Sequence, residues 1–298
     1  MPEPESGSIP ENVVLNLEGV ECGRVGSVTG GNATADVISE PPGPDHIVKK
    51  HLAGVKYEDI EVNCGTGMSR VVYDWIAATL KGTFQRKNGS IIVANHEGTA
   101  LRTLEFTNAL ITEVDIPAMD AHSRDLSFMT VKLTPELTRF SQGGTKVSIA
   151  GDGGAKRWVS ANFRLQIDGL DCTHVNHIDP FPITLTFESA NVGELRDFEK
   201  EPLQLNVPHL KVTLSEAFFT PSWYGWHEDF VIKGNNGADK LKNGTLTFLT
   251  QDQTKELAHI NFFNLGIFRL AQSFSEEEAI RSVTAEMFCE RVELVYQG

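Results

Sequence analysis

The chain has 298 residues, with 26 Lys and Arg against 40 Asp and Glu, and a formal charge of -14. Its hydrophobic residues (40%) and charged residues (22%) are in the proportions of an ordinary globular protein, which excludes a disordered chain, collagen or a coiled coil. Such an acidic surface repels the phosphate backbone, so it argues against a nucleic-acid-binding protein. It does not argue against a conduit through which nucleic acid passes.

The N-terminal stretch and the cysteines indicate where the protein is made. Residues 1–12 are acidic and rich in proline, with neither the basic start nor the apolar segment of a secretory signal. The four cysteines form no C-x-x-C pair, so neither a disulfide framework nor a zinc ribbon is predicted. We therefore expect cytoplasmic synthesis without a signal peptide. No apolar run approaches the roughly 20 residues that a membrane span needs.

The sequence repeats itself once, because Leu15–Cys22 is matched by Leu165–Cys172. Four further matches follow in the same order: Tyr73–Trp75 with Tyr224–Trp226, Lys87–Ser90 with Lys242–Thr245, Glu105–Asn108 with Asn261–Asn264, and Val131–Leu133 with Val292–Leu294. We predict an N-terminal tail (1–11), a first domain (12–140), a Gly-rich linker (141–159) and a second, homologous domain (160–298).

Each repeat is predicted to be mainly β-structure. Residues 12–20 and 58–63 alternate apolar and polar side chains, as half-buried strands do. The Asn88-Gly89 and Asn243-Gly244 pairs are typical of hairpin turns. Further strands are expected at 90–94, 101–108, 127–133, 245–250, 259–268 and 285–296.

One short helix is expected in each repeat. Ser69 can cap a helix that runs through Leu80, and Gly82 is a stop signal. Thr220 and Pro221 fit the start of the second helix. The predicted fold class is therefore mainly β, with two homologous β-sandwich or barrel domains that each carry one short α-helix.

Residues 50–134 resemble the tail tube proteins of contractile-tailed phages and of phage-like contractile injection systems. The resemblance lies in the order of Lys50–Val62, Gly65–Gly67, a helix bearing Trp75, Arg86–Ile92 and Leu104–Ala109. Two departures stand out: Ala53 occupies a position where proline is common, and family members are usually single domains of about half this length.

The resemblance implies a non-enzymatic structural subunit without a cofactor. Family members form six-subunit rings that stack into a hollow tube, with a helix facing the sheath and DNA or effector cargo passing through the lumen. The implied partners are other copies of the chain and sheath, baseplate or spike proteins. Three tandem chains could form a pseudo-hexameric adaptor ring. Alternatively, six chains could each place one domain in the tube.

Two groups of residues are candidates for contacts with other subunits. The aromatic residues are expected mainly in the core, with a sheath or subunit contact as the other interpretation: Tyr73, Trp75, Trp223, Tyr224 and Trp226. The long segment from Gly23 to Lys50 is either a mobile loop or the hairpin that tube proteins extend onto a neighbour. Its candidate contact residues are Gly30, Gly31, Pro41, Pro42, Lys49 and Lys50. Deleting residues 29–46 should then prevent assembly without unfolding the chain.

A metal site is weakly indicated by Cys172, His174, His177 and Asp179. Cys172 and His174 would lie on one face of a strand, and His177 could fold back toward them. The matching stretch of the first repeat lacks the histidines, so a small buried cysteine is the favoured interpretation. Neither a phosphate loop nor a catalytic motif is present. The alternative to a tube subunit is a tandem β-sandwich module that binds a ligand or a protein, and an enzyme with an unrecognised site comes third.

Overall fold

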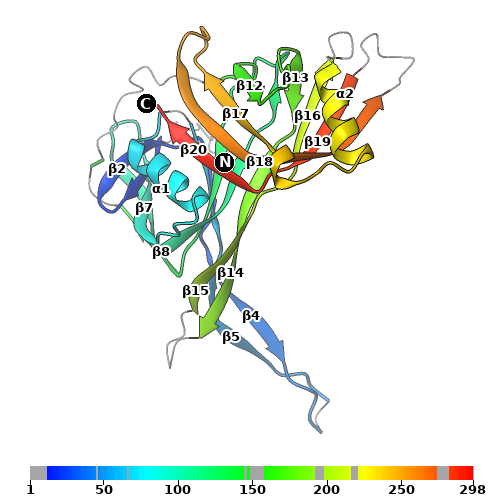
Figure 1. Cartoon of the computed structure of the whole chain (residues 1–298). Coiled ribbons are helices and arrows are strands. Elements are labelled where there is room, and N and C mark those ends of the chain that lie inside the picture. Colours follow the sequence, from blue (N-terminus) through cyan, green and yellow to red (C-terminus); the bar gives the residue numbers. More distant parts are fainter. Residues whose placement is uncertain are drawn as a thin grey trace, which may run out of the picture.

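The computed structural model describes residues 12–44, 46–65, 67–143, 146–147, 158–191, 198–215, 221–273 and 282–297. The predicted tail, most of the predicted linker and the predicted helix cap Thr220 lie outside these ranges. Figure 1 shows two β-rich lobes and a pair of long hairpins that project away from them.

The first sheet contains ten strands within the described residues, and its main path is β2-β1-β7-β8-β10-β6-β3. These strands are β1 (Asn12–Leu17), β2 (Val20–Arg24), β3 (Val28–Gly30), β6 (Ile60–Cys64), β7 (Lys87–Ala94), β8 (Ala100–Ile116) and β10 (Met129–Thr134). Strand β11 (Leu137–Gln142) continues β10 along the same side of β8. A separate hairpin is formed by β4 (Ala33–Ser39) and β5 (Lys50–Tyr57).

The second sheet contains eight strands in the described part of the chain, in the order β12-β17-β18-β19-β16-β13-β9, with β20 beside β18. Their bounds are β9 (Met119–Asp120), β12 (Phe163–Ile167), β13 (Val175–Ile178), β16 (Leu210–Ser215), β17 (Lys242–Leu249), β18 (Glu256–Ser273), β19 (Ser282–Phe288) and β20 (Arg291–Tyr296). The remaining strands, β14 (Phe181–Asn191) and β15 (Phe198–Asn206), form a hairpin that joins the first sheet.

The two sheets share one topology, which confirms the mainly β fold of two homologous repeats. The path β1-β7-β8-β10-β6-β3 of the first repeat becomes β12-β17-β18-β19-β16-β13 in the second. The side strands β11 and β20 also correspond, because each extends along the N-terminal half of the long central strand. The hairpins β4–β5 and β14–β15 occupy the same place in chain order.

The Asn-Gly pairs do not form the predicted turns, because both lie inside strands. Gly89 pairs with Phe106, and Gly244 pairs with Phe262. A Cβ on Gly89 would lie 2.5 Å from the Phe106 ring and 2.4 Å from the Asn16 carbonyl oxygen. The glycine therefore permits a close approach of strands, which is the second common use of this residue.

The last of the five sequence matches is also corrected. Val131 lies on β10, which pairs with the C-terminal half of β8. Val292 lies on β20, which pairs with the N-terminal half of β18. The counterpart of β10 is β19, because both strands flank the C-terminal half of their central strand. An alternating Val-x-Leu pattern fits any half-buried strand, so the sequence match shifted by one strand.

The two repeats exchange strands. Strand β14 of the second repeat pairs with β8 of the first, with Phe181 opposite Ile116. In the other direction, Met119 of β9 pairs with Ile178 of β13. Their buried side chains form one continuous hydrophobic cluster. The predicted domains are thus interlocked, and their boundaries stay a prediction.

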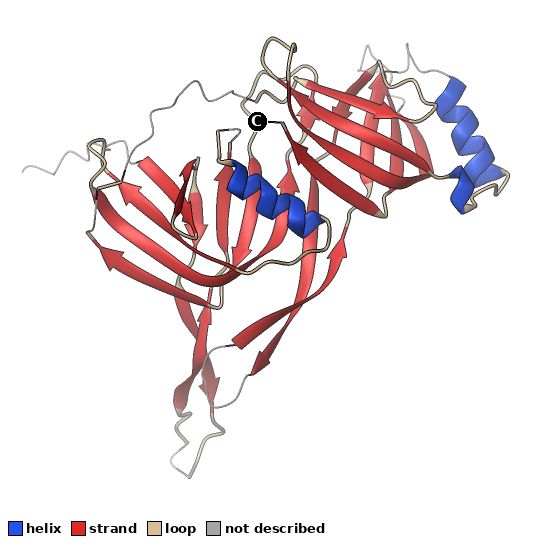
Figure 2. Ribbon diagram, turned by 60° about the vertical axis from the view of Figure 1, so that its left-hand side comes forward, coloured by secondary structure: helices blue, strands red, loops and turns tan. Residues whose placement is uncertain are grey.

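Each repeat carries the predicted helix. Helix α1 (Arg70–Leu80) begins after Ser69 and ends before Gly82, as predicted, although the Ser69 hydroxyl makes no capping bond. Helix α2 (Pro221–His227) continues into a π-helical turn (Glu228–Ile232), and a 3-10 turn follows at Ala238–Lys240. Figure 2 shows α1 close to both sheets and α2 at the outer end of the second. Among the described residues, no helix is both long enough and apolar enough to cross a membrane.

Candidate functional site

The first candidate surface is the junction between the two repeats. Strand β14 adds to the edge of β8 over four residue pairs, from Phe181 opposite Ile116 to Thr184 opposite Glu113. Phe181 and Ile183 are buried in this contact. Main-chain pairing supplies the attraction, and the alternate buried side chains set the register.

Charged and polar contacts fix the hairpin β14–β15 at the same junction. Lys200 donates its backbone N–H to Glu136 at 3.2 Å and its ammonium group to the Pro135 carbonyl oxygen at 2.8 Å. Arg86 donates to the Lys200 carbonyl oxygen and forms ion pairs with Glu136 and Glu199. Burial lowers the pKa of Lys200, with Asp59 and Glu136 acting in the opposite direction. A cavity of about 410 Å³ lies beside Lys200, between the two hairpins.

Helix α1 forms the other half of the junction by packing on β20 of the second repeat. Tyr73 of α1 and Tyr296 of β20 stack with ring centroids 3.8 Å apart and an interplanar angle of 10°. The Tyr73 hydroxyl donates to the Gly65 carbonyl oxygen at 2.7 Å. Burial, followed by the nearby Cys64 and Tyr296, raises the pKa of Tyr73 well above its ordinary value.

The structure places four of the five aromatic candidates inside the chain. Tyr73, Trp75, Trp223 and Trp226 are buried, and Tyr224 is 38% exposed. Trp75 donates its indole N–H to the Gln85 carbonyl oxygen, and Trp223 donates to that of Asp171, each at 2.9 Å. Core packing accounts for the buried members, so the predicted contact with another subunit falls mainly on Tyr224.

The loop candidates lie on the hairpin β4–β5 and at its base. Gly30 ends β3 and Gly31 follows it, both with positive φ. Pro41 and Pro42 lie at the exposed tip, Lys49 precedes the return strand β5, and Lys50 begins it. The structure therefore forms a long hairpin in this segment, and its contact with a neighbouring subunit stays a prediction.

The three metal candidates do not converge. His177 contacts Asp179, with Nε2 to Oδ1 at 3.2 Å, and lies 3.9 Å from Asp120. Cys172 is half-buried, and its thiol faces the Leu170 carbonyl oxygen. Among the residues that the structure describes, no group of three or more His, Cys, Asp or Glu side chains is arranged to hold a metal ion.

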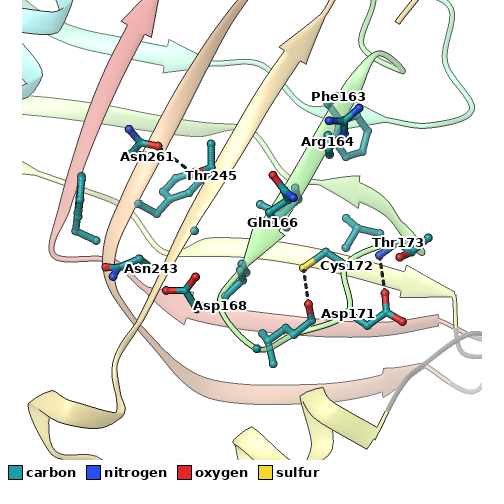
Figure 3. Close-up of a pocket in the computed structure, with 18 residues that line it drawn as sticks. Phe163, Arg164, Gln166, Asp168, Asp171, Cys172, Thr173, Asn243, Thr245 and Asn261 are labelled. Atoms are coloured by element: carbon teal, nitrogen blue, oxygen red, sulfur yellow. Dashed lines mark hydrogen bonds between the residues drawn. The ribbon is translucent and has the colours of Figure 1, made fainter. Parts of the chain in front are cut away.

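A cavity of about 990 Å³ lies along the edge of β12 in the second repeat. Figure 3 shows Gln166 and Asp168 beside Asn243 and Thr245, with the Thr245 hydroxyl donating to Asn261 at 3.0 Å. Strand β12 is an outermost strand of the described sheet, so no further strand fills the space beside it. In the first repeat, β2 covers the corresponding edge of β1.

The contribution of β14–β15 to the first sheet was missed in the sequence. Its β14 strand, Phe181–Asn191, begins with alternating buried residues such as Phe181, Ile183 and Leu185. That alternation is visible in the sequence and predicts a strand. Which sheet the strand joins is a non-local property that alternation does not encode.

Residues 13–138 match the family model of the T4-like virus tail tube protein gp19. This match confirms the resemblance inferred from the sequence, and the matched segment is a tail tube domain of that family. It spans nearly all of the first repeat and does not reach the second. No curated protein matches the chain.

Several solved structures are similar to a part of the chain. The PVC sheath/tube terminator in its extended state is 21% identical, with 47% of this chain and 97% of that chain covered and a TM-score of 0.37. The six-fold symmetrised baseplate of the anti-feeding prophage is 10% identical, with 45% and 91% covered and a TM-score of 0.37. Hcp1 from Flavobacterium johnsoniae is 12% identical, with 45% and 95% covered and a TM-score of 0.28. At these TM-scores the likeness carries no weight for function.

Proposed function

We propose that the chain is a non-enzymatic structural subunit of a contractile tail tube, or of the ring that terminates or adapts such a tube. The observation that carries the proposal is the tail tube domain at residues 13–138, followed by a second repeat of the same topology. A duplicated subunit that exchanges strands between its repeats is suited to building a continuous β-wall.

The proposed partners follow from this role. Other copies of the chain form the ring, and sheath, baseplate or spike proteins contact its outer surface and ends. DNA or effector cargo passes through the lumen without specific binding. The formal charge of -14 agrees with such passage, because an acidic wall repels the nucleic-acid backbone. Three chains would supply six repeats to one ring.

Electron microscopy of the concentrated, purified chain tests the proposal. Hollow rings or tubes are expected, and the particle mass gives the number of chains per ring. Single two-lobed particles at every concentration, with or without a partner ring as template, would contradict a tube role. That outcome would favour the alternative of a tandem binding module, to be followed by identification of the bound partner.

A further inference from the structure

The second repeat has an open sheet edge where the first repeat has a covered one. In the first repeat, β7 and then β14 lie along one side of β8. In the second repeat, β17 covers the corresponding side of β18 only up to Leu265. No strand in the described part of the chain pairs with the rest of that side, from Ile267 to Gln272.

The open edge has the same local geometry as the covered one. The β8–β10 pairing shifts register between Lys132 and Leu133, and the β18–β19 pairing shifts at the matching position, between Ile267 and Arg269. Arg269 is thereby the counterpart of Glu113. An open edge of this kind pairs readily with another strand.

The hairpin β4–β5 is the counterpart of the one that covers β8. Thr184 pairs with Asn206 in β14–β15, and Thr34 pairs with Lys56 in β4–β5. Both hairpins then shift register within the next three residues, at Thr186/Phe187 and at Ala35/Val37. In the described chain, β4 and β5 pair with each other and with no other strand.

We propose that β4 of one copy adds to the open edge of β18 in a second copy of this chain. The register follows from the equivalent pairing of β14 with β8. Thr34 of one copy lies opposite Arg269 of the other, as Thr184 lies opposite Glu113. Ala33 lies opposite Leu270, as Ile183 lies opposite Val114.

Helix α2 is the counterpart of α1, and α1 takes part in the equivalent contact inside the chain. We therefore include α2 in the proposed contact between copies. Helix α1 covers β20, where Leu294 is 2% exposed. The counterpart of β20 is β11, where Phe140 holds the place of Leu294 and is 55% exposed. Helix α2 and the π-helical turn after it, here called the α2 segment (residues 221–232), carry exposed apolar side chains, with Ile232 at 71%. The α2 segment of one copy thus covers Phe140 of the next.

Charge complementarity supports the same docking. Lys49, just before β5, and Lys50, its first residue, are equivalent in position to Glu199 and Lys200 of β15. Glu290, just before β20, is equivalent to Glu136, just before β11. Both glutamates accept a bond from an asparagine amide, Asn108 at 2.8 Å and Asn264 at 2.7 Å. Arg86 supplies the positive charge near Glu136. Its counterpart is Leu241, so the two lysines of the neighbouring copy supply that charge near Glu290.

The contact is heterologous, since two different surfaces meet. Repeating such a contact gives a ring when its rotation closes and an open filament when it does not. Every repeat then occupies one position in the wall of the ring. This favours three chains that each contribute both repeats over six chains that each place only one domain in the tube. The inference deepens the proposed function and rests on it for closure into a ring.

Disulfide trapping with T34C/R269C tests the register. Both side chains are exposed in the single chain. We expect mild oxidation of the assembled variant to give a ladder of covalent oligomers on non-reducing gels, which a reductant collapses. Mixing the single variants T34C and R269C should give a covalent dimer and nothing larger, because each chain then has one reactive end.

Three controls accompany the trapping. T184C/E113C places the matched pair inside one chain, so its disulfide should form without a change of oligomeric mass. S39C/R269C is out of register by five residues and should not cross-link. The native chain should stay uncross-linked, because Cys22, Cys64 and Cys289 are buried and burial raises the pKa of Cys64 to about 12 and that of Cys172 to about 11.

The outcomes separate the two proposals. Ring formation by T34C/R269C without cross-linking, while T184C/E113C forms its intrachain bond, would overturn the inference and leave the tube role standing. Cross-linking by S39C/R269C in place of the in-register pair would also overturn it. Absence of any assembly by the native chain and all variants would overturn both.

Discussion

The two long hairpins of the molecule have the same strand pairing within each hairpin but differ in what they contact. Hairpin β14–β15 lies on β8 and is held by Lys200, Arg86 and Glu136. Hairpin β4–β5 pairs with no other strand in the described chain, and Val37 and Leu52 on it are 60% and 69% exposed. Equivalent elements therefore have an internal contact in one repeat and an exposed surface in the other. The difference teaches that, under the proposed docking, the pairing of β14 with β8 shows inside one chain the contact that β4 makes with a second copy.

The largest expected effect tests whether both helices anchor their repeats. Trp75→Ala and Trp223→Ala each remove a fully buried indole, so each should lower the free energy of unfolding by about 3–5 kcal/mol. Urea denaturation followed by circular dichroism measures the loss. Tyr224→Ala is the exposed control and should change stability by less than about 1 kcal/mol. A small loss for Trp223→Ala alone would show that the second helix is not an anchor.

The strand glycines sharpen the comparison at the level of single contacts. A Cβ at position 89 would approach a backbone oxygen at 2.4 Å, whereas one at position 244 has its nearest neighbour at 3.0 Å. Gly89→Ala should therefore destabilise the chain by about 1–3 kcal/mol, the usual cost of overpacking. Gly244→Ala should cost less, as thermal unfolding of the two variants can measure. Equal losses would contradict the difference in strand approach.

The tyrosine stack tests the junction through its pH dependence. Tyr73→Phe keeps the ring but loses the hydrogen bond to Gly65, for an expected loss of about 1 kcal/mol. The pKa of Tyr73 is raised above its ordinary value of 10.0 in the folded chain. The unfolded phenol thus ionises first, and its contribution to stability is present below pH 10 and is lost as pH rises above it.

Stability should accordingly fall less steeply between pH 9 and about 11 in Tyr73→Phe than in the native chain. Chemical denaturation at several pH values measures both slopes, and lysine titration cancels in the difference. Tyr224→Phe serves as the exposed control. Parallel slopes for the native chain and Tyr73→Phe would contradict the burial of this phenol.

The smallest effect concerns an ion pair present in both repeats, in which the acidic and the basic residue have swapped positions. Lys132 contacts Glu113 at 2.8 Å in the first repeat, and Arg269 contacts Glu286 in the second. Lys132→Glu should destabilise the chain by about 0.5–1 kcal/mol, the range of partly exposed pairs. E113K/K132E should recover most of this loss, because the second repeat already has that order of charges. No recovery in thermal unfolding would show that Glu61 and Asp59 dominate around Lys132.

The local parts of the fold could be predicted from the sequence. Ser69 and Gly82 bound α1, and the alternation in residues 12–20 and 58–63 locates β1 and β6, although a turn ends the first strand at Leu17. These signals succeed because capping and alternation depend on neighbouring residues. The Asn-Gly pairs failed for the opposite reason, since Gly89 is set by Phe106 on the adjacent strand.

The candidate surface was only partly predictable. The hairpin holding Lys49 and Lys50 could be proposed from the long segment with Gly30 and Pro41, although its strands could not be assigned. Pairing of β14 with β8 brings Phe181 next to Ile116, far away in the sequence, and no local pattern encodes that choice. The buried aromatic candidates also needed the structure, because spacing alone does not tell a core tryptophan from an exposed one.

The exchange of β14 onto β8 has a consequence for how such a molecule arises and assembles. A chain with one repeat can cover its β8 edge only with the hairpin of another molecule. Fusion of two repeats turns that encounter into a unimolecular step, governed by an effective concentration instead of the amount of protein in the cell. Half of the joins in a closed ring would then form during folding, and only the other half would require collisions between molecules.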